Sequence, residues 1–316
     1  ALRVLPTNIP RNVTVLTLKN NSLSTLESSS FRGLTQLQIL HLQQNNLVSL
    51  PEDLFSSQLE LSKLYLYGNY LTSLPEKIFQ NTTKLTYLHL TGNRLTSILG
   101  KLFLPLSKLK TLVLANNKLQ VLSPHAFQNL VELEVISLAS NNLSFLPDTL
   151  FRSLHALQVC ALYNNKLSQL HETAFNGLNR LEWLTLANNT LQELPTKIFT
   201  QTNLQQLFLY NNKLETLTKD LLQPLRELNS LYLHGNQLRY LPEKLFENLP
   251  KLKAVSLCNN PWQCDCLNHY LWNWTLSHNH AHFIKCKGLN GVGSVICDSP
   301  QHLKGLPINH LSGMDC

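Results

Sequence analysis

Leucines recur along the chain with a fixed spacing that points to one repeated structural element. From Leu37 the sequence runs L-Q-I-L-H-L-Q-Q-N-N-L, which has the frame L-x-x-L-x-L-x-x-N-x-L. The asparagine of this frame returns every 24 residues, with one interval of 23. Its positions are Asn21, Asn45, Asn69, Asn93, Asn117, Asn141, Asn165, Asn189, Asn212, Asn236 and Asn260. A repeat of this period predicts a stack of similar units, each of which contributes one short strand.

A second apolar column lies ten residues after each asparagine. It contains nine of the twelve phenylalanines in the protein. Its members are Phe31, Phe55, Phe79, Phe103, Phe127, Phe151, Phe175, Phe199, Leu222 and Phe246. One repeat cannot bury its leucines alone, so the core must run from unit to unit, with the phenylalanines as a spine in the half opposite the strands. We expect each asparagine amide to satisfy backbone groups at the turn that leaves its strand.

The 24-residue unit with its x-L-P-x-x-x-F segment resembles the extracellular class of leucine-rich repeat proteins over nearly the whole chain. The resemblance implies an α/β solenoid, a curved horseshoe with a parallel sheet on its concave face and loops or short helical turns on its convex face. The short interval loses its residue between Phe199 and Leu204, on the convex side. We therefore expect a small local change there and an unbroken sheet.

The two ends differ from the repeats, and three regions follow. Residues 1–12 resemble the tail of the family's N-terminal cap, although that cap normally carries cysteines and here none precedes Cys160. Residues 13–257 are the repeats. Residues 258–316, with N-P-W-Q-C-D-C and C-D-S-P-Q-H-L-K-G, resemble the cysteine-rich C-terminal cap of secreted and cell-surface repeat proteins.

Cysteines concentrate in this last region, which indicates a disulfide module and an oxidising compartment. The family pattern implies two bridges, and the two cysteines left over are candidates for a third. The implied pairs are Cys264–Cys297 and Cys266–Cys316, and the candidate third pair is Cys258–Cys286. Between them, four apolar residues with i, i+3, i+4, i+7 spacing predict one face of a helix that closes the last repeat. They are Leu267, Tyr270, Leu271 and Trp274.

Composition and motifs argue against an enzyme. Charged residues make up 14% of the chain and hydrophobic ones 43%, which is typical of a folded protein. No apolar run approaches the ~20 residues of a membrane span. The sequence lacks G-x-S-x-G, H-E-x-x-H, P-loop and dinucleotide motifs, so we expect no catalysis and no cofactor. The alternation of His278, His280 and His282 invites a metal site, but a solvated cap loop explains it better, and we predict no metal. Cys160 takes a core leucine position, which favours a buried, inert thiol.

The positions between the inward leucines are free of the folding constraint, so we look there for function. Their aromatic residues form two clusters, separated by small residues that include Val113, Ala115, Ser137, Ala139 and Ala161. The first cluster is His41, Lys63, Tyr65, Tyr67, Tyr87 and His89. The second is Tyr163, Trp183, Phe208, Tyr210, Tyr232 and His234. Strands collect aromatics in any case, but the uneven distribution favours a binding surface.

Charge and sequons add two further features. The net charge is +7, and four basic residues one position past the frame asparagine form a flank: Arg94, Lys118, Lys166 and Lys213. This flank predicts either attraction to an acidic partner or a solvated edge that aids solubility. Candidate N-glycosylation sites begin at Asn12, Asn20, Asn81, Asn142, Asn188 and Asn273. Glycans at Asn20 and Asn188 would restrict the edge of the concave face.

Repeats of this kind with this C-terminal cap are most similar to the variable lymphocyte receptors of jawless vertebrates and to related receptor-like proteins of other chordates. Toll-like receptor ectodomains share the repeat. The resemblance implies a non-enzymatic, extracellular immune receptor, secreted or displayed at the cell surface, that recognises a protein or a microbial surface ligand such as a glycan or lipopolysaccharide. Nothing favours a nucleic acid. The alternatives are a cell-adhesion, matrix or neuronal guidance ectodomain, and a structural or inhibitory plasma glycoprotein.

Overall fold

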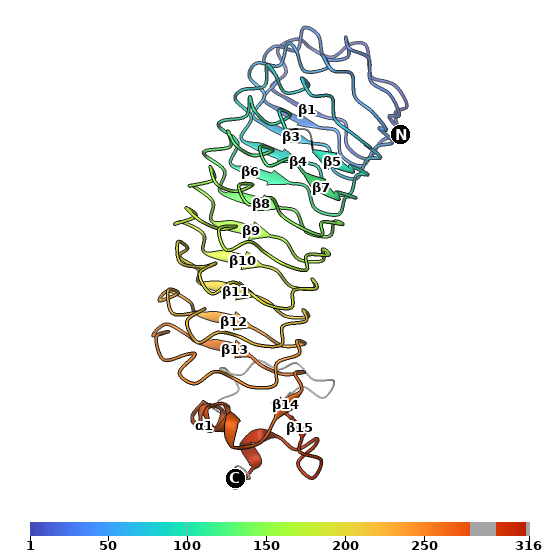
Figure 1. Cartoon of the computed structure of the whole chain (residues 1–316). Coiled ribbons are helices and arrows are strands. Elements are labelled where there is room, and N and C mark those ends of the chain that lie inside the picture. Colours follow the sequence, from blue (N-terminus) through green and yellow to red (C-terminus); the bar gives the residue numbers. More distant parts are fainter. Residues whose placement is uncertain (99, 279–294, 314–316) are drawn as a thin grey trace. The chain divides into compact units, whose positions relative to one another are not determined.

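The computed structural model describes residues 1–98, 100–278 and 295–313. The chain forms two compact units, Ala1–Lys166 and Leu167–Cys316, which we call unit 1 and unit 2. Both consist of coils that each supply one three-residue strand to a parallel sheet (Figure 1).

Unit 1 contains seven strands of the parallel sheet. They are β1 (Val15–Thr17), β2 (Ile39–His41), β3 (Lys63–Tyr65), β4 (Tyr87–His89), β6 (Thr111–Val113), β8 (Val135–Ser137) and β9 (Val159–Ala161). Their register follows the repeat, since Leu16 pairs with Leu40 and Leu40 with Leu64. A separate two-stranded sheet joins β5 (Ser97–Ile98) to β7 (Val121–Leu122) in the segments that leave the main strands.

Unit 2 contains four strands of the parallel sheet and the cap. The strands are β10 (Trp183–Thr185), β11 (Gln206–Phe208), β12 (Ser230–Tyr232) and β13 (Ala254–Ser256). Leu184 pairs with Leu207 across the short repeat, so the sheet is unbroken there, as predicted. The missing residue of this repeat changes the structure only in the loop before β11, where the Asn203 N–H donates to the Leu181 carbonyl at 3.2 Å.

The core follows the predicted columns. Frame leucines such as Leu40, Leu64 and Leu207 are fully buried. The phenylalanine rings stack on one another, with centroids 6.1 to 6.4 Å apart in pairs such as Phe79–Phe103 and Phe127–Phe151. Leu16 in the first strand is only half-buried.

Each frame asparagine ties its coil to the one before. The Nδ2 of Asn69 donates to the Leu66 carbonyl in its own turn and to the Leu42 carbonyl one coil earlier, both at 3.0 Å. Its Oδ1 accepts from the Leu47 N–H at 3.1 Å. Asn93, Asn117 and Asn236 make the same bonds in their own coils. The expectation that the asparagines satisfy backbone groups from repeat to repeat is confirmed.

The residue before each frame asparagine has a positive φ, which the sequence analysis missed. Asn or Gly occupies this position in most coils, and both tolerate the left-handed region. Gln44 and Ser140 are the exceptions, with φ of 55° and 54°.

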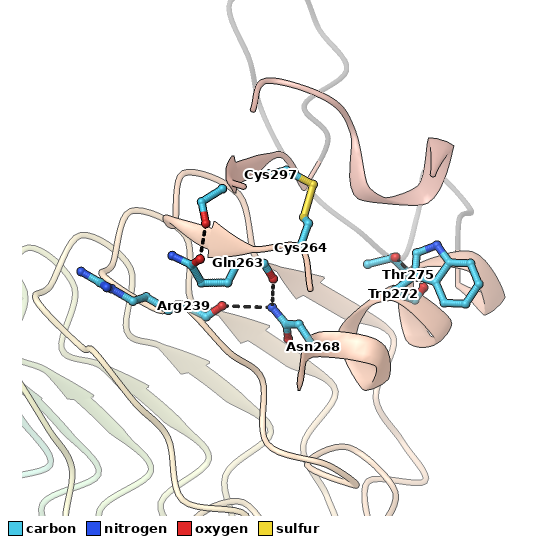
Figure 2. Close-up of a disulfide and its surroundings, with 8 residues drawn as sticks. Arg239, Gln263, Cys264, Asn268, Trp272, Thr275 and Cys297 are labelled. Carbon is cyan, nitrogen blue, oxygen red and sulfur yellow. Dashed lines mark hydrogen bonds between the residues drawn. A yellow bond between two sulfur atoms is a disulfide. The ribbon is translucent and has the colours of Figure 1, made fainter. Parts of the chain in front are cut away.

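The cap comes after β13. In chain order it contains β14 (Trp262–Gln263), a 3-10 helix η1 (Cys266–Asn268), helix α1 (His269–Ser277), β15 (Cys297–Ser299) and a second 3-10 helix η2 (Ile308–His310). The Cys264–Cys297 disulfide is present, as predicted (Figure 2). Cys258 and Cys266 are also disulfide-bonded. Cys286 and Cys316, which we assigned to them, lie outside the described residues, so both pairings remain predictions.

Asn268 joins the cap to the last coils in the way that frame asparagines join neighbouring coils. Figure 2 shows its Nδ2 donating to the carbonyls of Arg239 and Gln263, at 3.0 and 2.8 Å. Its Oδ1 accepts from the Leu241 N–H at 3.0 Å. The side chain is fully buried.

One part of the helix prediction is wrong. Leu271 and Trp274 are buried, and the Tyr270 hydroxyl accepts a hydrogen bond from the Phe246 N–H at 3.1 Å, so these three close the last coil. Leu267 is 76% exposed. It lies in η1, before α1 begins, and the tighter 3-10 turn directs it away from the face that helical spacing implied.

The predicted fold class is therefore confirmed as a parallel β-solenoid of leucine-rich coils with a C-terminal disulfide. Within the described residues α1 is the one α-helix, and the segments opposite the sheet are turns.

Candidate binding surface on the sheet face

The candidate surface is the exposed side of the parallel sheet, the face that the sequence analysis calls concave. We call it the sheet face. Along each strand the middle residue points into the core, while the residues on either side point outward. The three-residue strands carry these outward side chains on backbone that is hydrogen-bonded on both sides in the interior of each unit.

The first aromatic cluster is a contiguous set of rings in unit 1. His41 stacks on Tyr65 with ring centroids 4.5 Å apart, and Tyr65 meets Tyr87 on its other side at 5.1 Å. Tyr67 packs against His89 at 4.6 Å. These five rings are half-buried, whereas Lys63 at the edge of the cluster is exposed. The structure thus brings together the residues of the first predicted cluster.

Hydrogen bonds hold the two histidines of this cluster. The His89 Nε2 lies 3.0 Å from the Thr91 hydroxyl, and its Nδ1 lies 3.4 Å from the Tyr87 hydroxyl. Burial lowers the pKa of both His41 and His89, and for His41 the positive charge of Lys19 lowers it further, while a bond to Gln43 opposes the shift. Burial also raises the pKa of Tyr87, so its hydroxyl stays protonated.

The second aromatic cluster forms in unit 2 from three neighbouring strands. Phe208 lies between Trp183, at 5.2 Å, and Tyr232, which is stacked on it at 4.8 Å. Tyr210 stacks on His234 at 4.6 Å. Tyr163, which the sequence analysis grouped with these residues, belongs to unit 1.

His234 is fixed from the next strand. Its Nδ1 lies 2.8 Å from the hydroxyl of Ser256, a buried residue of β13. Burial lowers the pKa of His234, which favours the neutral ring. The rings of unit 2 therefore form a largely uncharged platform.

The small residues between the clusters are less available than expected. Ala139 has 0% exposure and Ala161 7%. These two side chains therefore offer almost no surface to a ligand. Val113, Ala115 and Ser137 are half-buried and remain on the face.

The basic flank residues are exposed in their respective units. In unit 1 the Arg94 guanidinium lies over the ring of Tyr70, 4.5 Å from its centroid, so one cation is held by a cation–π contact. Lys118 and Lys166 follow it in unit 1, and Lys213 lies in unit 2. Sequence reasoning missed Tyr70, although its place one residue after Asn69 is the flank position.

Of the sequon asparagines, Asn12, Asn20, Asn81 and Asn273 are exposed, whereas Asn142 and Asn188 are half-buried. The Asn81 Nδ2 donates to the Ser56 carbonyl at 2.8 Å, and the Asn188 Oδ1 accepts from Asn211 at 2.8 Å. Their glycosylation remains a prediction.

The remaining candidates for chemistry are Cys160 and the cap histidines. Cys160 is free and fully buried, and burial raises the pKa of its thiol far above the physiological range. The His278 ring stacks on Trp274, with centroids 4.8 Å apart, and His280 and His282 lie outside the described residues. The described residues contain no cluster of metal-ligating side chains and no helix long and apolar enough to cross a membrane.

Coils of this geometry, with a frame asparagine ladder and a parallel sheet, define a leucine-rich repeat protein. The family model described as leucine rich repeat matches residues 11–71, 35–95, 60–106, 83–143, 131–191 and 180–238. The chain belongs to the leucine-rich repeat family. A search of curated proteins found no match to the chain.

Solved structures share the fold. A chain of the glycosylated Toll–Spatzle complex from Drosophila aligns with a TM-score of 0.76 at 22% identity, over 98% of this chain and 53% of that one. This protein thus spans about half the length of that chain. A chain of the complex of latrophilin 3, Unc5D and the FLRT2 leucine-rich repeats aligns with a TM-score of 0.66 at 24% identity, over 98% of this chain and 92% of that one.

A leucine-rich repeat protein of Leptospira interrogans has a TM-score of 0.68 at 29% identity, over 86% of this chain and 79% of that one. The named assemblies among these structures are complexes with protein partners.

Proposed function

We propose that the protein is a non-enzymatic extracellular recognition module of the immune-receptor type, which binds its ligand through the sheet face. The observation that carries the proposal is the pair of aromatic clusters on that face. Their rings flank the inward leucines and do not replace them, so the core does not require them. The Cys264–Cys297 bridge and the extracellular neighbours support a location outside the cell.

Stacking among the rings favours a protein ligand over a glycan. Tyr65 lies between His41 and Tyr87, and Phe208 lies between Trp183 and Tyr232. A sugar packs on an open ring face, whereas Tyr65 and Phe208 each have one neighbouring ring stacked on them and a second ring tilted against them. What remains available is ring edges and hydroxyl groups, which suit the mixed apolar and hydrogen-bonding contacts of protein interfaces.

Rigidity makes these rings suitable as binding hot spots. The backbone beneath them is already fixed by the parallel sheet, and each ring is held by its stacking partner, so little conformational entropy is lost on binding. We place the main binding energy on the uncharged cluster of unit 2, where Tyr210 and Tyr232 offer large contact area with a polar tip.

A cell-adhesion or guidance ectodomain is the second candidate. It is supported by the FLRT2 leucine-rich repeat complex, with which the match covers 98% of this chain and 92% of that one. Both functions use the same surface and differ in the ligand. Binding of the soluble chain to whole bacteria supports the immune function, whereas selective binding to animal cell-surface proteins supports adhesion.

The test begins with the full chain, probed against whole bacteria and against an array of extracellular proteins. For the strongest protein ligand found, Tyr210→Ala and Tyr232→Ala should each weaken binding by about 1–3 kcal/mol. The melting temperature should remain nearly unchanged, because both rings are outside the core. Surface plasmon resonance and thermal denaturation provide the two measurements.

Ala115→Ser, at a half-buried position of the sheet face away from the rings, and Arg226→Ala, at an exposed position away from the sheet, are the matched controls. Both should bind normally. Normal binding by the tyrosine variants, together with loss of binding in Arg226→Ala, would place the contact elsewhere and refute the proposal.

A further inference from the structure

Charge is distributed unevenly on the sheet face of unit 1. In the first four coils, the strands and the turns that follow them occupy residues 14–22, 38–46, 62–70 and 86–94. These segments contain Lys19, Lys63 and Arg94 and no aspartate or glutamate at all. The first aromatic cluster lies at the centre of this region.

The register brings the cations and the rings together. Lys63 pairs with Tyr87 on one side and with Ile39 on the other, and Tyr65 pairs with His41 and His89. Lys19 is close enough to His41 to act electrostatically on its ring. The ammonium groups of Lys19 and Lys63 thus lie beside the tyrosine hydroxyls and imidazoles of the first aromatic cluster. These segments supply no carboxylate that would neutralise the two lysines.

We propose that the first aromatic cluster, with Lys19 and Lys63, is a subsite for the carboxylates of an acidic protein segment, and that it binds this segment more tightly as the pH falls toward 5.5. The inference rests on the proposed function, since it names the partner chemistry of the same sheet face.

Hydrogen-bonding capacity supports a carboxylate. Lysine ammonium and tyrosine hydroxyl groups donate, and charge-assisted bonds to carboxylates are among the stronger ones in proteins. Stacking also distinguishes an acidic protein from RNA. Single-stranded nucleic acids are held largely by bases that stack on open aromatic faces, whereas Tyr65 already has the His41 ring stacked on it and the Tyr87 ring tilted against it.

Gln43 can supply a hydrogen-bond acceptor to His41 when that ring is protonated. The Gln43 side chain is 4% exposed, its Nε2 lies 3.3 Å from the His41 Nδ1, and its Oε1 is buried without a hydrogen-bond partner among the described residues. When His41 takes up a proton, Nδ1 becomes a donor. Rotation of the Gln43 amide then presents Oε1 to that N–H, so the charged ring keeps a partner.

The direction of the pH effect follows from linkage. Burial holds the pKa of His41 and His89 below the ordinary 6.5, so both rings are neutral at pH 7.4 in the free protein. The groups around them are Lys19, Lys63 and the hydroxyls of Tyr65, Tyr67 and Tyr87. A bound carboxylate stabilises the imidazolium and raises both pKa values. Binding therefore takes up protons, and affinity rises as the pH falls.

The experiment uses the full chain and a fluorescein-labelled oligoglutamate peptide, with an oligoglutamine peptide and a single-stranded RNA of similar length as comparison probes. Fluorescence anisotropy at constant ionic strength gives affinities at pH 7.4 and at about pH 5.5, where glutamate (pKa ~4.3) is still ionised. Oligoglutamate should bind at least threefold more tightly at the lower pH, and oligoglutamine should bind at neither.

Three variants locate the effect. Lys63→Gln should weaken oligoglutamate binding about three- to tenfold at both pH values. The double variant His41→Gln, His89→Gln should abolish the gain at low pH. Lys101→Gln, at an exposed position in the turns opposite the sheet, is the matched control and should change affinity by less than twofold.

The proposal is overturned by absent oligoglutamate binding, by a pH gain that persists in the double histidine variant, by tighter binding of RNA, or by sensitivity to Lys101→Gln and not to Lys63→Gln. The proposed function would survive any of these if the ligand from the protein array still depends on Tyr210 or Tyr232. The proposed function itself fails when that ligand binds the Tyr210 and Tyr232 variants normally and loses binding to Arg226→Ala, so the two failures are distinguishable.

Discussion

At the scale of single residues, two neighbouring positions determine the shape of the turn that follows each strand. The frame asparagine bonds to backbone groups of two coils, and the residue before it takes a left-handed conformation. Leucines fill the core, but these two positions shape the turn that leaves each strand. The left-handed position also explains why Asn and Gly precede most frame asparagines.

Gln44 and Gly68 occupy this left-handed position in adjacent coils and allow a paired prediction. Gln44→Gly should stabilise the protein by about 0.5–1 kcal/mol, because the strain of a left-handed side chain (~1–2 kcal/mol) exceeds the entropic cost of glycine (~0.5–1 kcal/mol). Gly68→Ala should destabilise it by about 1–2 kcal/mol, since φ is +65° and the new Cβ would lie 3.2 Å from the Gln44 Cγ. Denaturant midpoints measure both. Equal shifts in the same direction would contradict this account.

At the scale of elements, the coils share one construction and the cap reuses part of it. Leu271, Trp274 and Tyr270 of α1 cover the last coil, and Asn268 supplies the hydrogen bonds that a further frame asparagine would make. The cap therefore closes the stack in two ways: α1 packs apolar side chains on the last coil, and Asn268 forms hydrogen bonds with the backbone groups of that coil.

Asn268→Ala should destabilise the cap by about 2–4 kcal/mol, because it leaves the Leu241 N–H and the carbonyls of Arg239 and Gln263 buried without this partner. Hydrogen exchange should speed up in the cap and last coils before it does in unit 1. Leu267→Ala is the matched control, and its exposed side chain should cost less than about 0.5 kcal/mol. A larger loss from Leu267→Ala than from Asn268→Ala would refute this role for Asn268.

At the scale of the whole molecule, the two units present different chemistry on the same kind of sheet. Unit 1 combines rings with lysines and histidines, whereas the unit 2 cluster is aromatic and uncharged. Repetition of the coil keeps the backbone constant, so the outward side chains alone distinguish the two surfaces.

The basic flank yields a prediction for the molecule as a whole. If it engages an acidic ligand, affinity should fall as salt rises, because exposed charges are screened over ~10 Å at 0.1 M. Replacing Lys118, Lys166 and Lys213 by Ser should slow association more than it speeds dissociation. Stopped-flow kinetics against the protein ligand, in low and high salt, measure this. Salt-independent association would assign the flank to solubility.

The sequence alone determined the architecture of this protein. The register of the strands, the phenylalanine spine and the asparagine ladder all agree with the structure, and the Cys264–Cys297 bridge that the family resemblance implied is present. The physical reason is the repeat itself. Each coil meets a neighbour like itself, so a position that must be buried in one coil must be buried in the next, and the pattern becomes visible as a period.

The tertiary structure decided what each position presents to a partner. It buried Ala139 and left Ala115 half-buried, exposed Leu267 and gave Asn268 the function of a frame asparagine. It also stacked His41 on Tyr65 and packed Tyr87 against Tyr65 at a tilt. The exposure of Leu267 follows from the local 3-10 turn. The ring contacts, and the bond from the Leu241 N–H to Asn268, join residues more than twenty positions apart in the chain. The period shows which residues point outward, but contacts between coils determine which of their atoms a ligand can reach.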